Sequence, residues 1–227
     1  MTSAPGGGSS WILAIDTATS LVVVAAGSPE GEPIGVRTFA AGHRHGSHLL
    51  PAFDALTADT GLALDRLGGV VVGLGPGAFT GLRVGLATAK TLAHALGAPI
   101  VGVSTGDALL RAAGAAHDVQ LLLPAGPHDR VVVVAGNSPR LEAGDAGPEP
   151  SGAIAIDLEG RASAAALERG RHALAGLPAT LLRLGAERLA AGDVDDVERL
   201  VPAYVSLPRG ITTEVGDGGV AWSRDPR

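Results

Sequence analysis

Three short runs of apolar residues follow one another near the start of the chain. They cover residues 11–15, 21–26 and 34–40 and are separated by the turn-rich segments 16–20 and 27–33. These connections are too short to hold a crossover helix, so consecutive strands must reverse direction. The pattern therefore predicts an antiparallel meander of three strands.

The apolar spacing then becomes helical. It predicts a helix over 48–60, a buried strand over 70–74, a second helix over 80–96 and a last strand over 100–103. A meander followed by crossovers gives a mixed sheet with helices packed on it. By analogy of fold, this order is typical of the ribonuclease-H-like unit. We therefore expect an α/β protein with the actin-like (ASKHA) architecture of two such domains.

The second half of the chain reads as a weaker copy of the first. Its pattern predicts strands over 119–123, 131–135 and 154–156, and helices over 108–113, 163–172 and 180–191. The predicted organisation is a disordered tail (1–10), a first domain (11–103), a smaller second domain (104–200), a C-terminal segment that packs back (201–215) and a flexible tail (216–227).

Composition narrows the functional classes. The chain of 227 residues has 46% hydrophobic and 3% aromatic residues, a formal net charge of −6 and a single lysine, Lys90. Strong binding to nucleic acid needs clustered cations and stacking rings, so we do not expect it. The chain has no cysteine, the start lacks the features of a secretion signal, and no run is long enough to cross a bilayer. We expect a cytoplasmic protein.

Two turns are candidates for contact with a nucleotide. Asp16-Thr-Ala-Thr-Ser20 offers a carboxylate and hydroxyls, and Gly75-Pro-Gly77 leads from a predicted strand into a helix. Acidic oxygens position metal ions, whereas turn amides and helix starts favour phosphate. Ordinary polar turns would show the same residues. The candidate nucleotide- or phosphate-binding residues are Asp16, Thr17, Thr19, Gly75 and Gly77.

No constellation for catalysis is apparent. His43, His45 and His48 have a spacing that could serve a metal, but the nearest carboxylate in the sequence is Asp54, so a solvated loop is the favoured interpretation. The chain contains no nucleophile elbow, no His-Glu-x-x-His and no P-loop. We therefore expect no catalytic residue and no metal site.

The helix over 80–96 has three different sides. One side is apolar, one carries Arg83, Lys90 and His94, and the third is nearly without bulk. Glycine inside a helix costs about 1 kcal/mol relative to alanine, so glycines on the third side need a compensating close approach. The neighbour would be the 48–60 helix or another protein chain. The residues of this third side are Gly77, Gly81, Gly85, Thr88 and Leu92.

Several segments together resemble one protein family. They are Ile12-Leu-Ala-Ile-Asp-Thr-Ala-Thr-Ser20, His45 with Leu49-Leu-Pro51, the run Gly73-Leu-Gly-Pro-Gly-Ala-Phe-Thr-Gly-Leu-Arg-Val-Gly-Leu-Ala-Thr-Ala-Lys90, Gly102-Val-Ser104 and Pro202-Ala-Tyr204. They resemble the TsaB (YeaZ) family, whose members take part in the threonylcarbamoyl modification of tRNA. The resemblance is dense over 11–107 and thin beyond.

The resemblance implies a non-catalytic subunit. Such a subunit binds and stabilises its paralogue, the TsaD transferase, in the complex that makes N6-threonylcarbamoyladenosine at position 37 of tRNAs reading ANN codons, and the ATPase TsaE joins them. It has no cofactor of its own; ATP or ADP at a subunit junction and a homodimer remain open. The implied partner interface lies on the first domain's two helices, at Leu49, Leu50, Phe53, Leu56, Gly81, Gly85, Thr88 and Leu92.

The departures from the family pattern concern the second half. The TsaD family marks its metal site with His-x-x-x-His after the strand over 100–103, and this chain has Ser104-Thr-Gly-Asp-Ala-Leu109 there. Val205-Ser206 stands where an arginine is frequent, and 123–130 differs from the usual Asp-Ala-Arg run. The alternative function is a free-standing ATP-dependent phosphotransferase of the actin-like superfamily.

Overall fold

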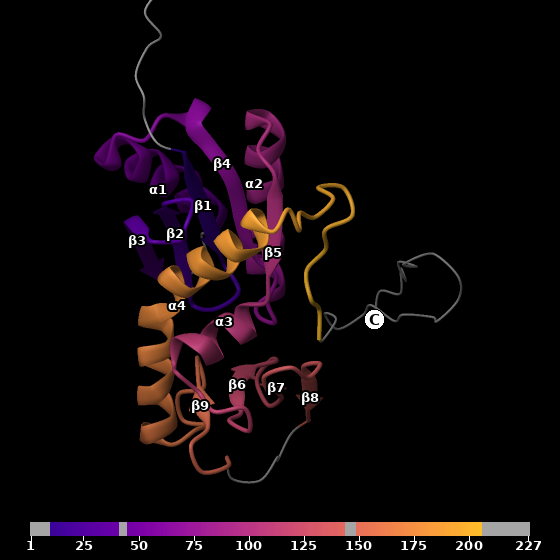
Figure 1. The fold of residues 1–227 in the computed structure, drawn as a ribbon. Coiled ribbons are helices and arrows are strands. Elements are labelled where there is room, and N and C mark those ends of the chain that lie inside the picture. The colour runs from indigo at the N-terminus through magenta and orange to yellow at the C-terminus, as the bar shows by residue number, and fades with distance from the viewer. Residues whose placement is uncertain (1–9, 41–44, 144–148, 206–227) are drawn as a thin grey trace, which may run out of the picture.

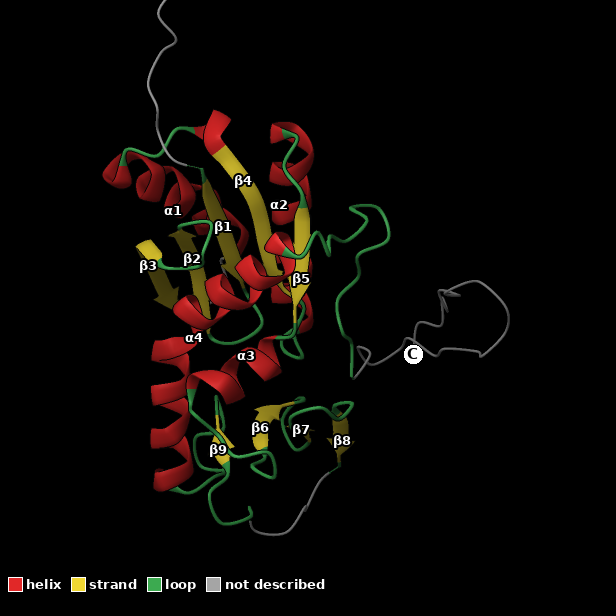
Figure 2. Cartoon of the chain, viewed as in Figure 1, coloured by secondary structure: helices red, strands yellow, loops and turns green. Residues whose placement is uncertain are grey.

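The computed structural model describes residues 10–40, 45–143 and 149–205. The predicted tails therefore lie outside the described residues, except for Ser10, as does most of the 201–215 segment. Two sheets lie one above the other, with helices around them (Figures 1 and 2). Within these ranges, no helix combines the length and the apolar character that a membrane span requires.

The first sheet has five strands in the order β3-β2-β1-β4-β5. The strands are β1 (Trp11–Asp16), β2 (Leu21–Gly27), β3 (Pro33–Ala40), β4 (Leu67–Gly73) and β5 (Ile100–Val103). The first three pair antiparallel, whereas β4 is parallel to both β1 and β5. The predicted meander and mixed sheet are thus confirmed. Parallel pairing also brings the carboxyl ends of β1, β4 and β5 to one edge of the sheet.

Helices α1 (His45–Thr60) and α2 (Phe79–Leu96) cover one face of this sheet. Leu49, Phe53 and Leu56 of α1 are buried in the same core as Leu86 and other apolar residues of α2. The apolar stripe predicted for α2 therefore faces the sheet. The helix stops at Gly97, which adopts the left-handed conformation that L side chains rarely take. A short 3₁₀ helix, Leu64–Arg66, precedes β4.

The opposite face is covered by α4 (Ala164–Ala190), a helix of 27 residues. Sequence patterning predicted two helices, 163–172 and 180–191, and this prediction is wrong. Pro178 lies inside the continuous helix, because its own burial and that of Leu177 and Leu181 outweigh the lost backbone hydrogen bond. The first half of α4 packs on the lower sheet and the second half on the upper one (Figure 1).

The second sheet has the order β8-β7-β6-β9. Its strands are β6 (Leu121–Pro124), β7 (Arg130–Val133), β8 (Arg140–Glu142) and β9 (Ile154–Ala155). Strand β8 was not predicted, because it is short and its apolar residue is exposed; an ion pair of 2.7 Å between Arg130 and Glu142 ties it to β7. Helix α3 (Thr105–Ala112) starts earlier than predicted, and Ser104 caps it by accepting a hydrogen bond from the Asp107 amide at 3.1 Å.

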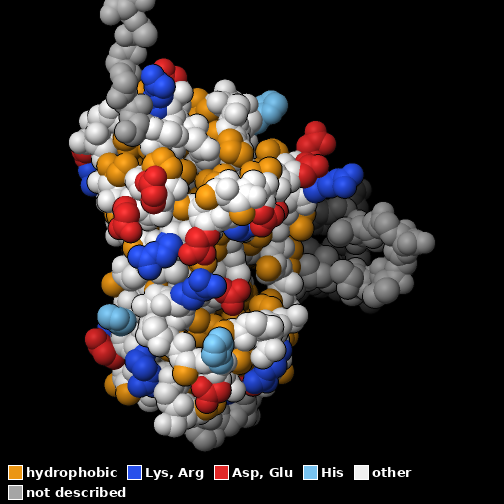
Figure 3. Space-filling view, in the orientation of Figure 1, with side chains coloured by type: hydrophobic (Ala, Val, Ile, Leu, Met, Phe, Trp, Pro, Cys, Tyr) orange, Lys and Arg blue, Asp and Glu red, His pale blue; other side chains and the backbone are white. Residues whose placement is uncertain are grey.

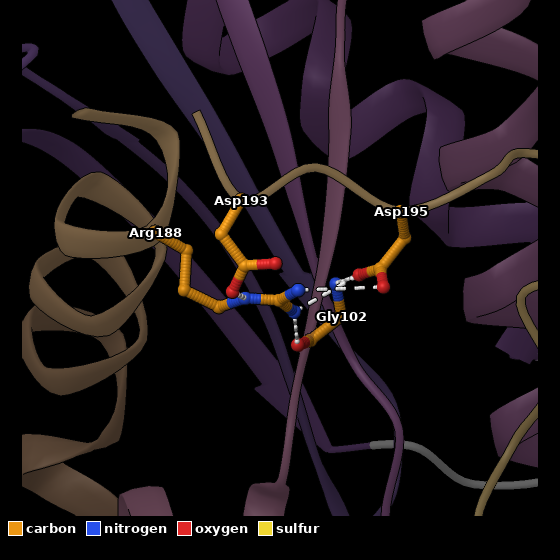
Figure 4. Close-up of polar contacts among 4 residues, drawn as sticks. All are labelled: Gly102, Arg188, Asp193 and Asp195. Atoms are coloured by element: carbon orange, nitrogen blue, oxygen red, sulfur yellow. Dashed lines mark hydrogen bonds and ion pairs between the residues drawn. The ribbon is translucent and has the colours of Figure 1, made fainter. Parts of the chain in front are cut away.

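After α4 the chain returns to the first sheet through residues 193–205, here named the C-terminal strap. Arg188 at the end of α4 donates to Asp193, to Asp195 and to the carbonyl oxygen of Gly102 on β5 (Figure 4). Asp195 also pairs with Ile100 along the edge of β5. The fork of Arg188 thus fixes the strap to the sheet edge. Arg188 was not among the residues singled out in the sequence.

We expect Gly185→Ala to destabilise the protein. Alanine is the better helix former by about 1 kcal/mol, but a Cβ at position 185 would overlap the Val71 side chain of β4. Overpacking of this kind costs about 1–3 kcal/mol, so the free energy of unfolding in urea should fall. Gly176→Ala is the control in the same helix, because its nearest neighbour would be Ala112 at 3.1 Å. A stabilised Gly185→Ala variant would contradict this packing.

Candidate functional site

The two predicted phosphate-binding turns pack directly on each other at the carboxyl edge of the first sheet. The Ala78 amide donates to the carbonyl oxygen of Ala18 at 2.7 Å. A Cβ on Gly77 would overlap that same carbonyl group, so glycine is required there. The peptide bond between Gly75 and Pro76 is cis. The structure therefore brings the candidate nucleotide-binding residues together, although they are distant in the sequence.

Asp16 lies at the centre of this contact and is not exposed at all. Its carboxylate accepts hydrogen bonds from the Ala18 amide at 2.9 Å and from the Thr105 hydroxyl at 2.5 Å. Burial raises the pKa of the Asp16 carboxyl from 3.8 to about 6, and the two hydrogen bonds oppose that rise. The Thr105 hydroxyl oxygen in turn accepts a hydrogen bond from the Gly75 amide at 3.0 Å. These bonds link the carboxyl ends of three strands, β1, β4 and β5. Thr105 was not among the candidate site residues, because its place in the fold depends on contacts distant in the sequence.

The turn also contacts the glycines of α2 and explains one of them, Gly85. The Thr17 hydroxyl donates to the carbonyl oxygen of Gly81 at 2.7 Å, and a Cβ on Gly85 would overlap the Thr17 side chain. We expected either the other interface helix or another protein chain to approach these glycines. That expectation is wrong for Gly85, because its neighbour is the turn after β1.

Ser20 connects the turn to the second sheet. Its amide donates to the Asp157 carboxylate at 2.8 Å, and its hydroxyl donates to the same carboxylate. Asp157 follows β9 and has a φ of 55°, a left-handed conformation that is uncommon outside glycine. Asp157 therefore holds the turn from the opposite half of the molecule. Nothing in the sequence had singled it out.

Most polar groups of the candidate nucleotide site already have partners within the chain. Asp16, Thr17 and Thr19 are buried, and each makes at least one intrachain hydrogen bond. In this conformation a phosphate would have to displace the packed turns or bind beside them. The nucleotide-binding role of these residues stays a prediction.

The residues predicted for the partner interface separate into two groups. Leu49, Leu56 and Gly81 are buried in the chain's own fold, as are Phe53 and Gly85. By contrast, the side chain of Leu50 is 50% exposed, and Thr88 and Leu92 are half-buried. Only the second group is available to another protein without rearrangement.

The exposed side of α2 carries small side chains together with the basic residues Arg83 and His94. Residues three or four positions apart share one side of a helix, and the exposed small residues of this side are Thr80, Ala87, Thr91 and Ala95. We name these four residues the α2 outer face. Next to it, the Arg83 guanidinium lies 3.8 Å from the centre of the Phe79 ring, and Arg83 donates to the Tyr204 hydroxyl at 3.2 Å. The strap therefore borders this face.

The histidine motif does not form a describable site. His43 lies outside the described residues, the side chain of His45 is also outside them, and His48 makes an edge contact with the Phe39 ring at 6.1 Å. Among the residues whose placement is described, no group of three His, Cys, Asp or Glu side chains could hold a metal ion.

Comparison with known proteins assigns the family. The family described as TsaD, tRNA N6-adenosine threonylcarbamoyltransferase, matches residues 30–150, just over half of the chain. The chain belongs to this family. The more specific resemblance to TsaB is also confirmed by individual relatives. A tRNA threonylcarbamoyladenosine biosynthesis protein TsaB of Haemophilus influenzae is 33% identical over 114 residues, which are 50% of this chain and 48% of that protein.

Two further comparisons agree. An uncharacterized protein of Mycobacterium leprae is 45% identical over 101 residues, covering 43% of this chain and 28% of that protein. YeaZ from Pseudomonas aeruginosa superposes with a TM-score of 0.63 at 25% identity, over 85% of this chain and 98% of that structure. The matched part of the chain spans half or less of the length of the curated relatives. The structural similarity, in contrast, extends over both sheets.

The buried Asp16 predicts a pH dependence of stability. Its folded-state pKa of about 6 exceeds the ordinary 3.8, so the folded state binds more protons between these values. The raised pKa of Asp16 therefore stabilises the folded state below about pH 4, and this contribution to the free energy of unfolding is lost as the pH rises to about 6. Relative to Asp16→Asn, the wild-type free energy of unfolding should fall by up to about 3 kcal/mol over that window. Urea titrations at several pH values measure it, and parallel profiles would contradict it.

Proposed function

We propose that this chain is a non-catalytic subunit of the machinery that makes threonylcarbamoyladenosine in tRNA, and that it binds and stabilises a TsaD transferase. The names of its TsaB relatives and the match to the TsaD family support the process. The observation that carries the binding role is the α2 outer face, an exposed strip of small side chains with Arg83 and His94 beside it. Such a face lets another helix approach closely, because small side chains keep the helix axes near each other.

The architecture supports this proposal. We infer that the two sheets are the two ribonuclease-H-like domains of an actin-like (ASKHA) protein, with α1 and α2 on the outer face of the first domain. A TsaD paralogue would present a matching helix pair. We further infer that TsaE joins the assembly, that it works in the cytoplasm, and that ATP or ADP binds at the junction with TsaD.

The structure favours this function over a free-standing phosphotransferase. Such an enzyme would need phosphate contacts from the turn at Asp16 and from the loop at Gly75. In this chain the Asp16 carboxylate is buried and hydrogen-bonded to Ala18 and Thr105, and Gly77 packs on Ala18. Calorimetry with Mg-ATP tests the point: tight binding with turnover, lost in Asp16→Ala, would favour the enzyme.

Charge on the α2 outer face should abolish the complex. We expect Ala87→Glu to reduce binding to a co-expressed TsaD at least a hundredfold, because a larger side chain keeps the helices apart and its carboxylate is costly to desolvate at a close helix contact. Size-exclusion chromatography of the co-expressed pair measures complex formation, and thermal unfolding of the isolated chain checks its fold. Substitution of Gly85 is unsuitable, because a side chain there would overlap Thr17.

The matched control is Ala165→Glu on α4. Ala165 is also exposed on a helix but lies in the half of α4 that serves the second sheet. It should leave complex formation unchanged. Co-elution of TsaD with Ala87→Glu would place the interface elsewhere, and light scattering without TsaD would show whether a second copy uses the same face.

A further inference from the structure

A cavity of about 710 Å³ opens between the two halves of the molecule. Its walls come from α3, from the second half of α4, and from the segments that follow β5 and β7. Figure 3 shows this side of the molecule, hollowed between its upper and lower parts and rimmed by acidic and basic side chains. The volume lies in the range of small-molecule sites.

The charged groups around this cavity are not paired with one another. Asp107 and Arg111 line it from α3, Glu187 from α4 and His117 from the loop after α3. Asp107 is half-buried and the other three are exposed, and among the described residues none of these four side chains forms an ion pair or a hydrogen bond. Arg188, which also lines the cavity, has two carboxylate partners. Asp107 and Arg111 lie one helical turn apart, a spacing that favours pairing. Groups of both signs thus stand unpaired around one space.

The position of the cavity also suits a small ligand. It lies beyond Val103, at the carboxyl end of a parallel strand, where open α/β sheets bind ligands. The start of α3 at Ser104 lines it and adds a partial positive charge. Its polar groups come from three segments of the chain: α3, the loop after it and α4.

We propose that this cavity binds a small zwitterion with the chemistry of a free amino acid or dipeptide. The Arg111 guanidinium receives the ligand carboxylate, with the His117 imidazole beside it. The Glu187 and Asp107 carboxylates receive the ligand ammonium group. A ligand with a single charge could contact only the basic or only the acidic groups, so a zwitterion makes more favourable contacts here. This inference does not depend on the proposed TsaD partner.

Titration calorimetry and NMR of the full chain test the proposal. The probes are glycine, glutamate and alanyl-alanine, with acetate and methylammonium as single-charge comparisons. At least one zwitterion should bind and shift the amide signals of Gly102, Ser104 and Gly136, which line the cavity. Acetate and methylammonium should bind at least tenfold more weakly.

Variants that remove one charged side chain from the cavity provide the second part of the test. Arg111→Gln and Glu187→Gln should each weaken zwitterion binding about tenfold or more, because each removes one charged partner. The controls are Arg183→Gln and Glu198→Gln, which change exposed side chains away from the cavity lining and should bind as the wild type does. The proposal is overturned if no zwitterion in the panel binds, if acetate or methylammonium binds equally well, or if the two cavity variants retain wild-type affinity.

Discussion

The hydrogen bonds of the buried Asp16 carboxylate hold the carboxyl edge of the first sheet together. Asp16 ends β1, its partner Thr105 begins α3 after β5, and Thr105 also accepts from Gly75 after β4. A buried carboxylate is tolerated only where such donors compensate for lost water. The turn after β1, the loop before α2 and the start of α3 therefore have one mutual arrangement. Asp157, which follows β9 of the second sheet, accepts a hydrogen bond from the Ser20 amide of the same turn.

This arrangement depends on positions where the backbone comes very close to another backbone segment or to a buried side chain. Gly73 leaves room for the Asp16 carboxylate, Gly77 for the Ala18 carbonyl and Gly85 for Thr17. Each glycine allows a contact that a methyl group would prevent. The glycine-rich loop and helix are thus explained first as packing within the chain. A chain with few aromatic residues gains its close packing in this way, through small side chains and short distances between elements.

Helix α2 has different surroundings on each side. Its apolar side lies on the sheet, its glycines receive the turn at Thr17, and Arg83 and Lys90 contact the C-terminal strap. The small side chains of the α2 outer face remain exposed beside Arg83 and His94, and our proposal for a protein partner rests on them. The charged cavity lies between α3 and α4, on the other side of the first sheet. A partner on α2 and a small ligand in the cavity would therefore not compete for space.

The sequence by itself determined the strand meander, the strand and helix order of the first half and the family, because apolar periodicity and the glycine-rich motif are local signals. It also identified Asp16 and the glycines after β4 as candidate site residues. Only tertiary structure decided what these residues touch, since Thr105 and Asp157 are far away in sequence. It also merged two predicted helices into α4, because burial across both sheets outweighs the local cost of Pro178. Finally, it decided that Leu49 and Leu56 serve the core while Leu50 stays exposed, since helix orientation against the sheet sets which side is buried.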